Sequence, residues 1–193
     1  MNRWRLKEII VMAVLSVVFG IVYLAFLPVG KLLVTFMGPI GYDFIFGIWF
    51  IVSIIAAYIL RKPGAAFLSE TIAATVEMML GNAMGPIIIV TGMIQGLGAE
   101  AAFAVTRYRR YSLWVLMLAG VGAAIFSFIW GYFRSGYVAL STPYIMSMLV
   151  IRMISGAIIS GILGKAISDS LAKTGVLSSF ALGKHMRKER SVS

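Results

Sequence analysis

Long apolar stretches recur along the whole chain and are separated by short groups of polar and basic residues. A run of roughly 18 or more apolar residues is long enough to cross a bilayer as a helix. The runs that approach or exceed this length predict six spans, at about 8–27, 40–60, 64–82, 85–105, 112–133 and 144–172. The pattern therefore predicts an all-α integral membrane protein, built as a bundle of six transmembrane helices.

The composition agrees with lipid as the surrounding solvent, because 61% of the 193 residues are hydrophobic and only 12% are charged. The net charge of +10 could suggest nucleic-acid binding, but the position of the charges is more informative than their sum. All of the 17 Lys and Arg residues except Lys31, Arg134 and Arg152 fall on one side of the predicted membrane. The positive-inside rule then places both termini in the cytoplasm, and we expect no nucleic-acid partner.

Two segments differ from the predicted spans. Residues 173–193 turn polar and basic, which predicts a mobile cytoplasmic tail after a membrane domain formed by residues 1–172. Residues 27–41 carry Pro28 and Pro39 and stay apolar, although the topology places them outside the cell. We expect an outer loop there that folds back over another part of the protein.

Two carboxylates, Glu70 and Glu77, lie within the third predicted span among small and apolar residues. Positions seven apart differ by only about 20° around a helix and by about 10 Å along its axis, so the two acids form one polar stripe. A charge at mid-membrane costs about 2.5–3.5 kcal/mol on insertion scales. The stripe should therefore face the bundle interior, water or a counter-charge.

Structural explanations compete with a functional one for each acid. Arg152 lies at a depth similar to that of Glu77, and the two could form an ion pair, although Glu70 would then have no partner. Glu100 stands near the cytoplasmic end of the fourth span and is expected to reach toward the basic interface. Asp43 begins the second span, where a helix N-terminus stabilises an acid.

Polar and aromatic residues accompany the stripe toward the outer ends of the spans. Asn82 closes the third span, and Gln95 lies in the middle of the fourth. The aromatic candidates are Tyr42, Phe46 and Trp49 in the second span and Trp130 in the fifth. An interfacial aromatic belt would explain any one of these rings, but carboxylates beside aromatic faces favour an organic cation. Two acids against one arginine leave a deficit of one positive charge, which a cationic ligand could supply.

Several kinds of chemistry are excluded by what the sequence lacks. The chain contains no cysteine, and its single histidine, His185, lies in the basic tail. A His-based metal site or a Ser–His nucleophile therefore cannot form within the membrane. No G-x-x-x-x-G-K-[ST] phosphate loop is present. We expect neither an enzyme nor a bound cofactor, and any accumulation of solute must draw on an ion gradient or on partner chains.

Small residues spaced by four mark places where helices can approach closely. Ser16 and Gly20 share one face of the first span, with Ala13 on nearly the same face, and a similar stripe occurs over 156–164. Such stripes serve either packing within the bundle or the docking of a partner.

Three stretches carry a resemblance to a known family: GPIGYDFIFGIWF (38–50), SETIAATVEMMLGNAMG (69–85) and QGLGAE (95–100). Over essentially the whole chain, the sequence resembles the S components of energy-coupling factor (ECF) vitamin transporters. More narrowly, it resembles the YkoE family of thiamine or hydroxymethylpyrimidine S components. The resemblance implies a substrate-binding subunit of an ABC-type importer in the bacterial cytoplasmic membrane. It would capture thiamine or its hydroxymethylpyrimidine precursor from outside the cell.

The resemblance also implies partners and ligand contacts. The subunit would dock through small residues of its first helix, here Ala13, Ser16 and Gly20, onto a transmembrane coupling subunit driven by two ATPases. S components commonly show Ala-x-x-x-Ala at this place, and Ser16-x-x-x-Gly20 departs from that pattern. The outer segment 27–41 would be a lid. The ligand would be held by Glu70, Glu77, Asn82, Gln95, Tyr42, Phe46, Trp49 and Trp130.

Two other functions remain open from the residues alone. A stand-alone, proton-coupled secondary transporter of a small organic cation would use Glu70 and Glu77 to carry protons. A purely structural protein would pair its acids internally. Uptake that persists without an ATPase partner and collapses with the proton gradient would favour the secondary transporter.

Overall fold

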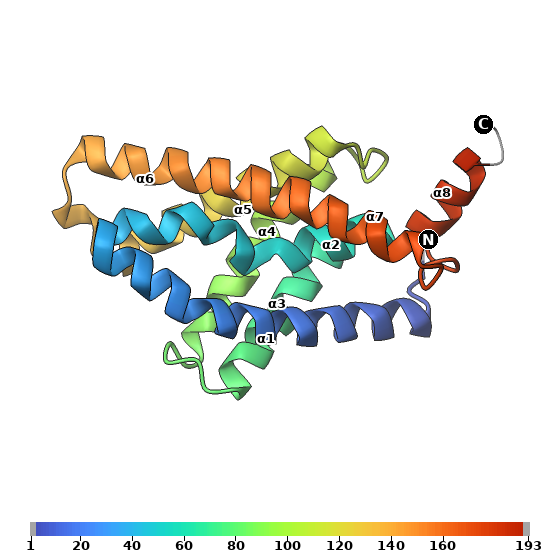
Figure 1. The fold of residues 1–193 in the computed structure, drawn as a ribbon, viewed down its shortest axis with the longest axis horizontal. Helices are drawn as coiled ribbons and strands as arrows, with labels where there is room; N and C mark the ends of the chain where they lie inside the picture. Colours follow the sequence, from blue (N-terminus) through green and yellow to red (C-terminus); the bar gives the residue numbers. More distant parts are fainter. Residues whose placement is uncertain (1–2, 191–193) are drawn as a thin grey trace.

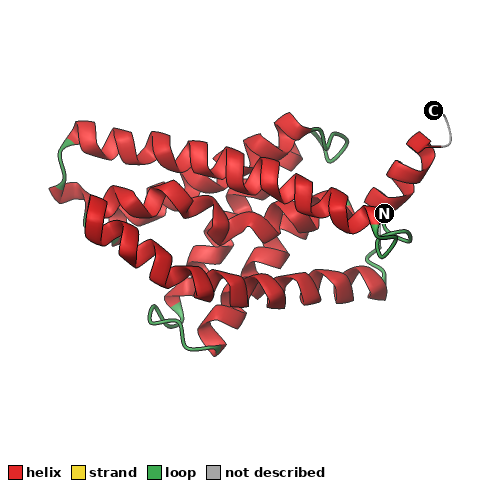
Figure 2. Cartoon of the chain, in the orientation of Figure 1, coloured by secondary structure: helices red, strands yellow, loops and turns green. Residues whose placement is uncertain are grey.

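The computed structural model describes residues 3–190, and every regular element in that range is helical (Figures 1 and 2). The elements are α1 (Leu6–Met37), η1 (Pro39–Phe50), α2 (Ile51–Leu60), α3 (Ala65–Met79), α4 (Ile87–Val105), α5 (Leu113–Arg134), η2 (Tyr137–Ala139), α6 (Thr142–Ser155), η3 (Gly156–Leu163), α7 (Gly164–Lys173) and α8 (Ala181–Arg190). The segments η1 and η2 are 3₁₀ helices, and η3 is a π-helical continuation of α6. The predicted all-α class is confirmed.

Within residues 3–190, five helical stretches are long and apolar enough to cross a membrane. They are Leu6–Met37, Pro39–Leu60, Ile87–Val105, Leu113–Arg134 and Thr142–Lys173, and each overlaps a predicted span. The remaining predicted span corresponds to α3, which has 15 residues. At 1.5 Å per residue α3 would be about 22 Å long, shorter than the hydrocarbon core of about 30 Å. A sixth crossing therefore stays a prediction.

The continuous segment η1–α2 lies at the centre of the bundle. In Figure 1 it runs between α1 on one side and the α6–α7 helix on the other, and it also contacts α3. All ten residues of α2 are buried, which explains why its sequence, IVSIIAAYIL, shows no polar face. By contrast, α1 exposes a row of apolar side chains, including Val14, Val17 and Ile21, as expected for a helix at the periphery of a membrane bundle.

The prediction of an outer loop over residues 27–41 is wrong for most of this segment. Helix α1 continues through Pro28 to Met37, and the chain turns at Gly38, whose φ of 74° suits glycine. A proline within a membrane helix removes only one hydrogen bond and is tolerated there. Gly41 then packs directly on the backbone of Leu33, so η1 returns alongside α1. Most of the segment expected to be a lid is therefore the last third of α1.

The prediction of a mobile tail is also wrong for its first part, up to residue 183, and stays a prediction for the rest. Leu177, Phe180 and Leu182 are buried against the core, and the ammonium group of Lys7 lies 5.8 Å from the centre of the Phe180 ring. The helix α8 follows, at the same end of the bundle as the start of α1 (Figure 1). Residues 1–2 of the predicted membrane domain and residues 191–193 of the predicted tail lie outside the described residues.

The small-residue stripe of the first helix is internal packing. Ser16 and Gly20 are buried, and Ala13 is half-buried. A Cβ atom on Gly20 would lie 2.9 Å from the backbone oxygen of Ala73 in α3, so no larger residue fits. Ser16 and Gly20 are therefore already covered by the chain itself, and a partner that docked on them would have to displace α3.

Glycines also bring α5 into backbone contact with its neighbours. A Cβ atom on Gly120 would overlap the carbonyl oxygen of Gly156, and one on Gly98 in α4 would overlap that of Gly122. Such contacts stabilise membrane helix pairs because they let backbones approach closely and increase van der Waals contact. They hold α4, α5 and the α6–η3 helix together around the cavity described below.

We predict that Gly120→Ala lowers the free energy of unfolding by about 1–3 kcal/mol, because the added methyl group forces α5 and η3 apart. Gly164→Ala is the matched control, since a Cβ atom there would meet Ile51 Cγ1 at 3.4 Å, an ordinary contact distance. Thermal unfolding of the purified variants in detergent checks the difference. Equal midpoints for the two variants would contradict the proposed backbone contact.

Candidate functional site

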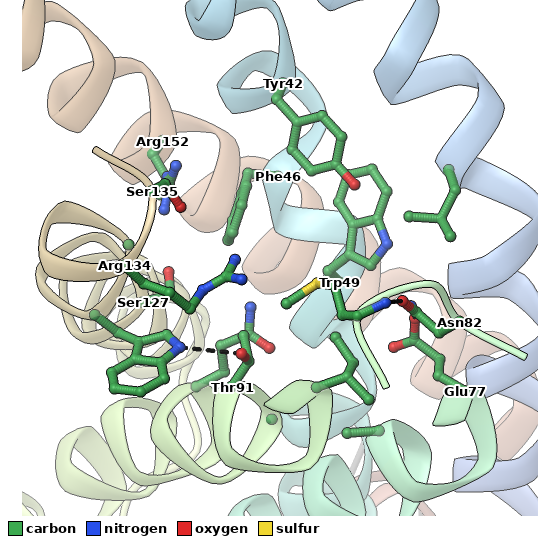
Figure 3. A pocket seen from close by; sticks show the side chains of 18 of the residues that line it. Tyr42, Phe46, Trp49, Glu77, Asn82, Thr91, Ser127, Arg134, Ser135 and Arg152 are labelled. Carbon is green, nitrogen blue, oxygen red and sulfur yellow. Dashed lines mark hydrogen bonds between the residues drawn. The ribbon is translucent and has the colours of Figure 1, made fainter. Parts of the chain in front are cut away.

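A cavity with a volume of about 230 Å³ lies between η1, the end of α3, α4, α5 and α6 (Figure 3). It combines aromatic faces with carboxylate, amide, hydroxyl and guanidinium groups. Seven of the eight residues predicted to hold a ligand line it: Tyr42, Phe46, Trp49, Glu77, Asn82, Gln95 and Trp130. The structure thus brings together residues from four separate predicted spans, and their part in binding stays a prediction.

Glu77 has a fixed orientation at one wall of the cavity. The side-chain amide of Asn82 donates a hydrogen bond of 2.8 Å to Glu77 Oε2, and the backbone N–H of Met84 donates one of 2.9 Å to Asn82 Oδ1. The chain turns after α3, which brings Asn82 back to Glu77. This turn is possible because Gly81, just after the end of α3, adopts a φ of 94°. Among residues 3–190, no basic group lies within ion-pair distance of Glu77. One carboxylate thus faces the cavity without a counter-charge.

An aromatic platform forms the neighbouring wall. The rings of Tyr42 and Trp49 stack with their centres 4.6 Å apart and an interplanar angle of 16°, while Phe46 meets Tyr42 edge-on at 6.0 Å. Trp49 is held in place because its indole N–H donates a hydrogen bond of 3.2 Å to the backbone oxygen of Tyr23. The platform offers flat apolar surface next to the Glu77 carboxylate, as Figure 3 shows.

Helices α4 and α5 supply the floor of the cavity. The indole N–H of Trp130 donates a hydrogen bond of 3.1 Å to Thr91 Oγ1, so this ring is oriented but its donor is already used. Gln95 follows Thr91 by one helical turn and is buried. In the described part of the chain the Gln95 amide has no hydrogen-bond partner, which leaves both its donor and its acceptor groups for a bound molecule.

Arg152 pairs with Asp43, so the ion pair with Glu77 that the sequence left open is wrong. The Arg152 Nε atom donates a hydrogen bond of 2.6 Å to Asp43 Oδ1, and its Nη2 atom lies at the same distance from that oxygen. The guanidinium also lies over the Phe46 ring, 3.8 Å from its centre, and donates to the Tyr137 hydroxyl at 3.2 Å. Asp43 is completely buried, so it does more than stabilise a helix N-terminus.

Glu70 does not line the cavity, although it shares the buried face of α3 with Glu77. The Tyr23 hydroxyl donates a hydrogen bond of 3.2 Å to Glu70 Oε2 and accepts one of 3.1 Å from the backbone N–H of Val52. The polar stripe predicted on α3 therefore exists, but only its outer acid reaches the cavity. Because Glu70 does not line the cavity, a ligand in the cavity would not touch it directly, and the ligand contact predicted for Glu70 has no support from the structure.

Glu100 caps α3, a function that the sequence reading missed. Its carboxylate accepts hydrogen bonds from the backbone N–H groups of Gly64, Ala66 and Phe67, at 2.6, 3.0 and 3.2 Å. These donors at the start of α3 have no partner within the helix, and the helix dipole favours a negative charge there. Glu100 therefore has partners within the protein, and the expectation that it reaches toward the interface stays a prediction.

Further residues line the cavity that the sequence reading did not include. The most informative are Ser127 and Arg134 of α5, Ser135 and Tyr137 of the connection to α6, and Arg152. Most of them lie at the end of α5 or in the segments that follow it, so these polar side chains come together only when the chain folds back after α5. One signal did point to Arg134 and Arg152: they are two of the three basic residues outside the basic side of the predicted membrane.

The comparisons with known proteins all match transport proteins. A family model described as "ABC-type cobalt transport system, permease component" matches residues 7–126. The "Putative HMP/thiamine permease protein YkoE" of Bacillus subtilis (strain 168) is 59% identical over 190 residues, which cover 98% of this chain and 96% of that protein. A solved structure described as "Crystal structure of an S-component of ECF transporter" matches with a TM-score of 0.96 and 59% identity, over 98% of this chain and 96% of the other.

Together with the helical membrane fold, these matches identify the chain as the substrate-binding subunit of a transporter, not as an enzyme. It is an integral membrane protein. More narrowly, the chain belongs to the YkoE family of ECF-transporter S components, as the three quoted stretches of its sequence predicted.

We predict strong energetic coupling between Asp43 and Arg152. Removing one partner, as in Asp43→Leu, leaves the other charge buried and should lower the free energy of unfolding by about 3–5 kcal/mol. The double variant Asp43→Leu/Arg152→Met removes both charges and should be clearly more stable than the sum of the single effects predicts. A thermal-unfolding cycle of the four proteins tests this, and additive effects would argue against the pair.

Proposed function

We propose that this chain captures thiamine or its hydroxymethylpyrimidine precursor from outside the cell, in the cavity between η1, α3, α4 and α5. It needs no cofactor of its own, and ATP is used only by partner subunits. The proposal is supported by the chemistry of the cavity and by the relative from Bacillus subtilis, whose description names HMP and thiamine.

The observation that carries the proposal is the Glu77 carboxylate, oriented by Asn82 beside the stacked rings of Tyr42 and Trp49. An aminopyrimidine is a flat ring whose edge combines an amino donor with ring nitrogens. Its face fits an aromatic platform, and its amino group fits a carboxylate that accepts hydrogen bonds. The free amide of Gln95 can pair with the mixed donor and acceptor edge of the same ring.

The size of the cavity suits a small ligand. Its volume of about 230 Å³ exceeds the volume of about 150 Å³ of an engineered apolar cavity that binds benzene. A single substituted heteroaromatic ring therefore fills it well, while a two-ring ligand such as thiamine would also use the open side toward Arg134.

We further propose six membrane crossings, with α3 as the sixth, and both termini in the cytoplasm of a bacterial cell. One support is that most basic residues lie on one side of the predicted membrane. Another is that the two described chain ends lie at the same end of the bundle (Figure 1). The short α3 is tolerable because it packs between α1, α2 and α4 and not against lipid alone.

The partners in this proposal are a transmembrane coupling subunit and two ATPase subunits. Since Ser16 and Gly20 are covered by α3, the surface of the first helix that is open to the coupling subunit is its apolar outer face. That face presents Val14, Val17 and Val18, with half-buried Ala13 beside it.

We predict that Glu77→Gln weakens binding of thiamine and hydroxymethylpyrimidine by about ten- to hundredfold, because a hydrogen bond to a charged acceptor is lost. Glu189→Gln is the matched control, since Glu189 is exposed on α8, far from the cavity in sequence and in the fold. Calorimetric titration of the detergent-purified proteins measures the change. Unchanged affinity in Glu77→Gln would contradict the proposal that this carboxylate binds the ligand.

We predict that uptake of radiolabelled thiamine into cells requires co-expression of the coupling and ATPase subunits. Uptake should cease when the ATPases carry a disabled nucleotide site and should persist, at least initially, when the proton gradient is collapsed. The opposite pattern would support the proton-coupled carrier instead. Glu70, buried with no basic partner among the described residues, would then be the first candidate proton site.

A further inference from the structure

The two ends of the cavity carry opposite charges. Glu77 stands at the end formed by α3, and Arg134 stands at the end of α5. Figure 3 shows the Arg134 guanidinium pointing into the cavity, between Phe46 and Thr91. Arg134 is exposed, so it lies at the open side of the cavity and not within its wall.

Arg134 differs from the other arginine of the cavity in having no counter-charge. Arg152 is neutralised by Asp43 and held by Tyr137. Within residues 3–190, no carboxylate lies within ion-pair distance of Arg134. A ligand with positive charge alone would complement Glu77 but would leave Arg134 unmatched.

Two hydroxyl groups that line the same cavity add hydrogen-bond donors for an anion. The Tyr137 hydroxyl accepts its hydrogen bond from Arg152, so its own proton is free to be donated. The Ser135 hydroxyl has no partner in the part of the chain that the structure describes, and it also lines the cavity. Guanidinium and hydroxyl donors together are the usual ligands of a phosphate group.

We propose that Arg134, with Ser135 and Tyr137, forms an anion subsite, so that the ligands of this cavity include aminopyrimidines that carry a phosphate ester. The inference rests on the proposed function, because it takes the pyrimidine ring to lie against Tyr42 and Trp49 with its amino edge toward Glu77. The hydroxymethyl group of the single ring is bonded to the carbon next to the one that bears the amino group, so it stays on the side of Glu77. In thiamine the second ring extends from this position and carries its hydroxyethyl oxygen toward Arg134. A free alcohol there accepts one hydrogen bond, whereas a phosphate monoester accepts several and supplies the missing negative charge.

The test compares hydroxymethylpyrimidine with its phosphate monoester, and thiamine with thiamine monophosphate, by calorimetric titration of the full chain at neutral pH. We expect thiamine monophosphate to bind about tenfold or more tightly than thiamine, and hydroxymethylpyrimidine phosphate, whose ester lies next to the amino group, to show a smaller preference over its alcohol. Arg134→Gln should weaken binding of thiamine monophosphate by at least about tenfold and binding of thiamine by less, and Arg134→Lys should keep part of the preference. Lys31→Gln removes one exposed charge outside the cavity and should keep all of it.

Results against the anion subsite can be told apart from results against the proposed function. Alcohols that bind while their esters bind no better would overturn the anion subsite and leave the proposed function intact. A preference for esters that persists in Arg134→Gln, or disappears equally in Lys31→Gln, would also overturn it, since the attraction would then come from the general field of the protein. Absence of binding by all four probes would overturn the proposed function and the subsite together.

Discussion

The buried ion pair between Asp43 and Arg152 is the interaction on which the site depends most. It joins η1 to α6 in a region with little water, where an unpaired charge would be costly. The same two helical segments are also linked by a hydrogen bond of 3.0 Å from the Gly47 N–H to the Ser155 hydroxyl. Because η1 carries Tyr42, Phe46 and Trp49, this attachment fixes the aromatic platform relative to the rest of the cavity.

The acids of the bundle differ in where their remaining hydrogen-bonding capacity lies, and among Asp43, Glu70, Glu77 and Glu100 only Glu77 lines the cavity. Glu100 accepts three backbone hydrogen bonds at the start of α3, and Asp43 pairs with Arg152 through Oδ1, while its Oδ2 atom is buried without a partner among residues 3–190. Glu77 receives a single side-chain hydrogen bond, from Asn82, and its remaining capacity faces the cavity. A buried polar group whose hydrogen bonds are only partly made within the protein is suited to bind a ligand. Binding then supplies the missing hydrogen bonds and removes the free-energy penalty of leaving them unmade.

Much of the fold could be predicted because hydropathy is a local property. Every span long enough to cross the membrane appeared close to its expected position, and the periodicity of α3 correctly placed Glu70 and Glu77 on one buried face. Prediction failed where proline and glycine suggested a loop over residues 27–41, since a membrane helix tolerates proline better than a soluble one. It also missed the partners of Glu100, which are backbone groups of another helix.

The sequence by itself determined which segments are apolar enough to cross a membrane, that Glu70 and Glu77 share one helix face, and which residue types could form a binding site. These depend on the order of apolar and polar residues along one helix. Only the tertiary structure decided the partners, because depth leaves the rotation of each helix open. Arg152 could have reached Glu77 or Asp43, and the packing of α6 against η1 turned it toward Asp43. That choice left Glu77 facing the cavity, opposite an unpaired Arg134.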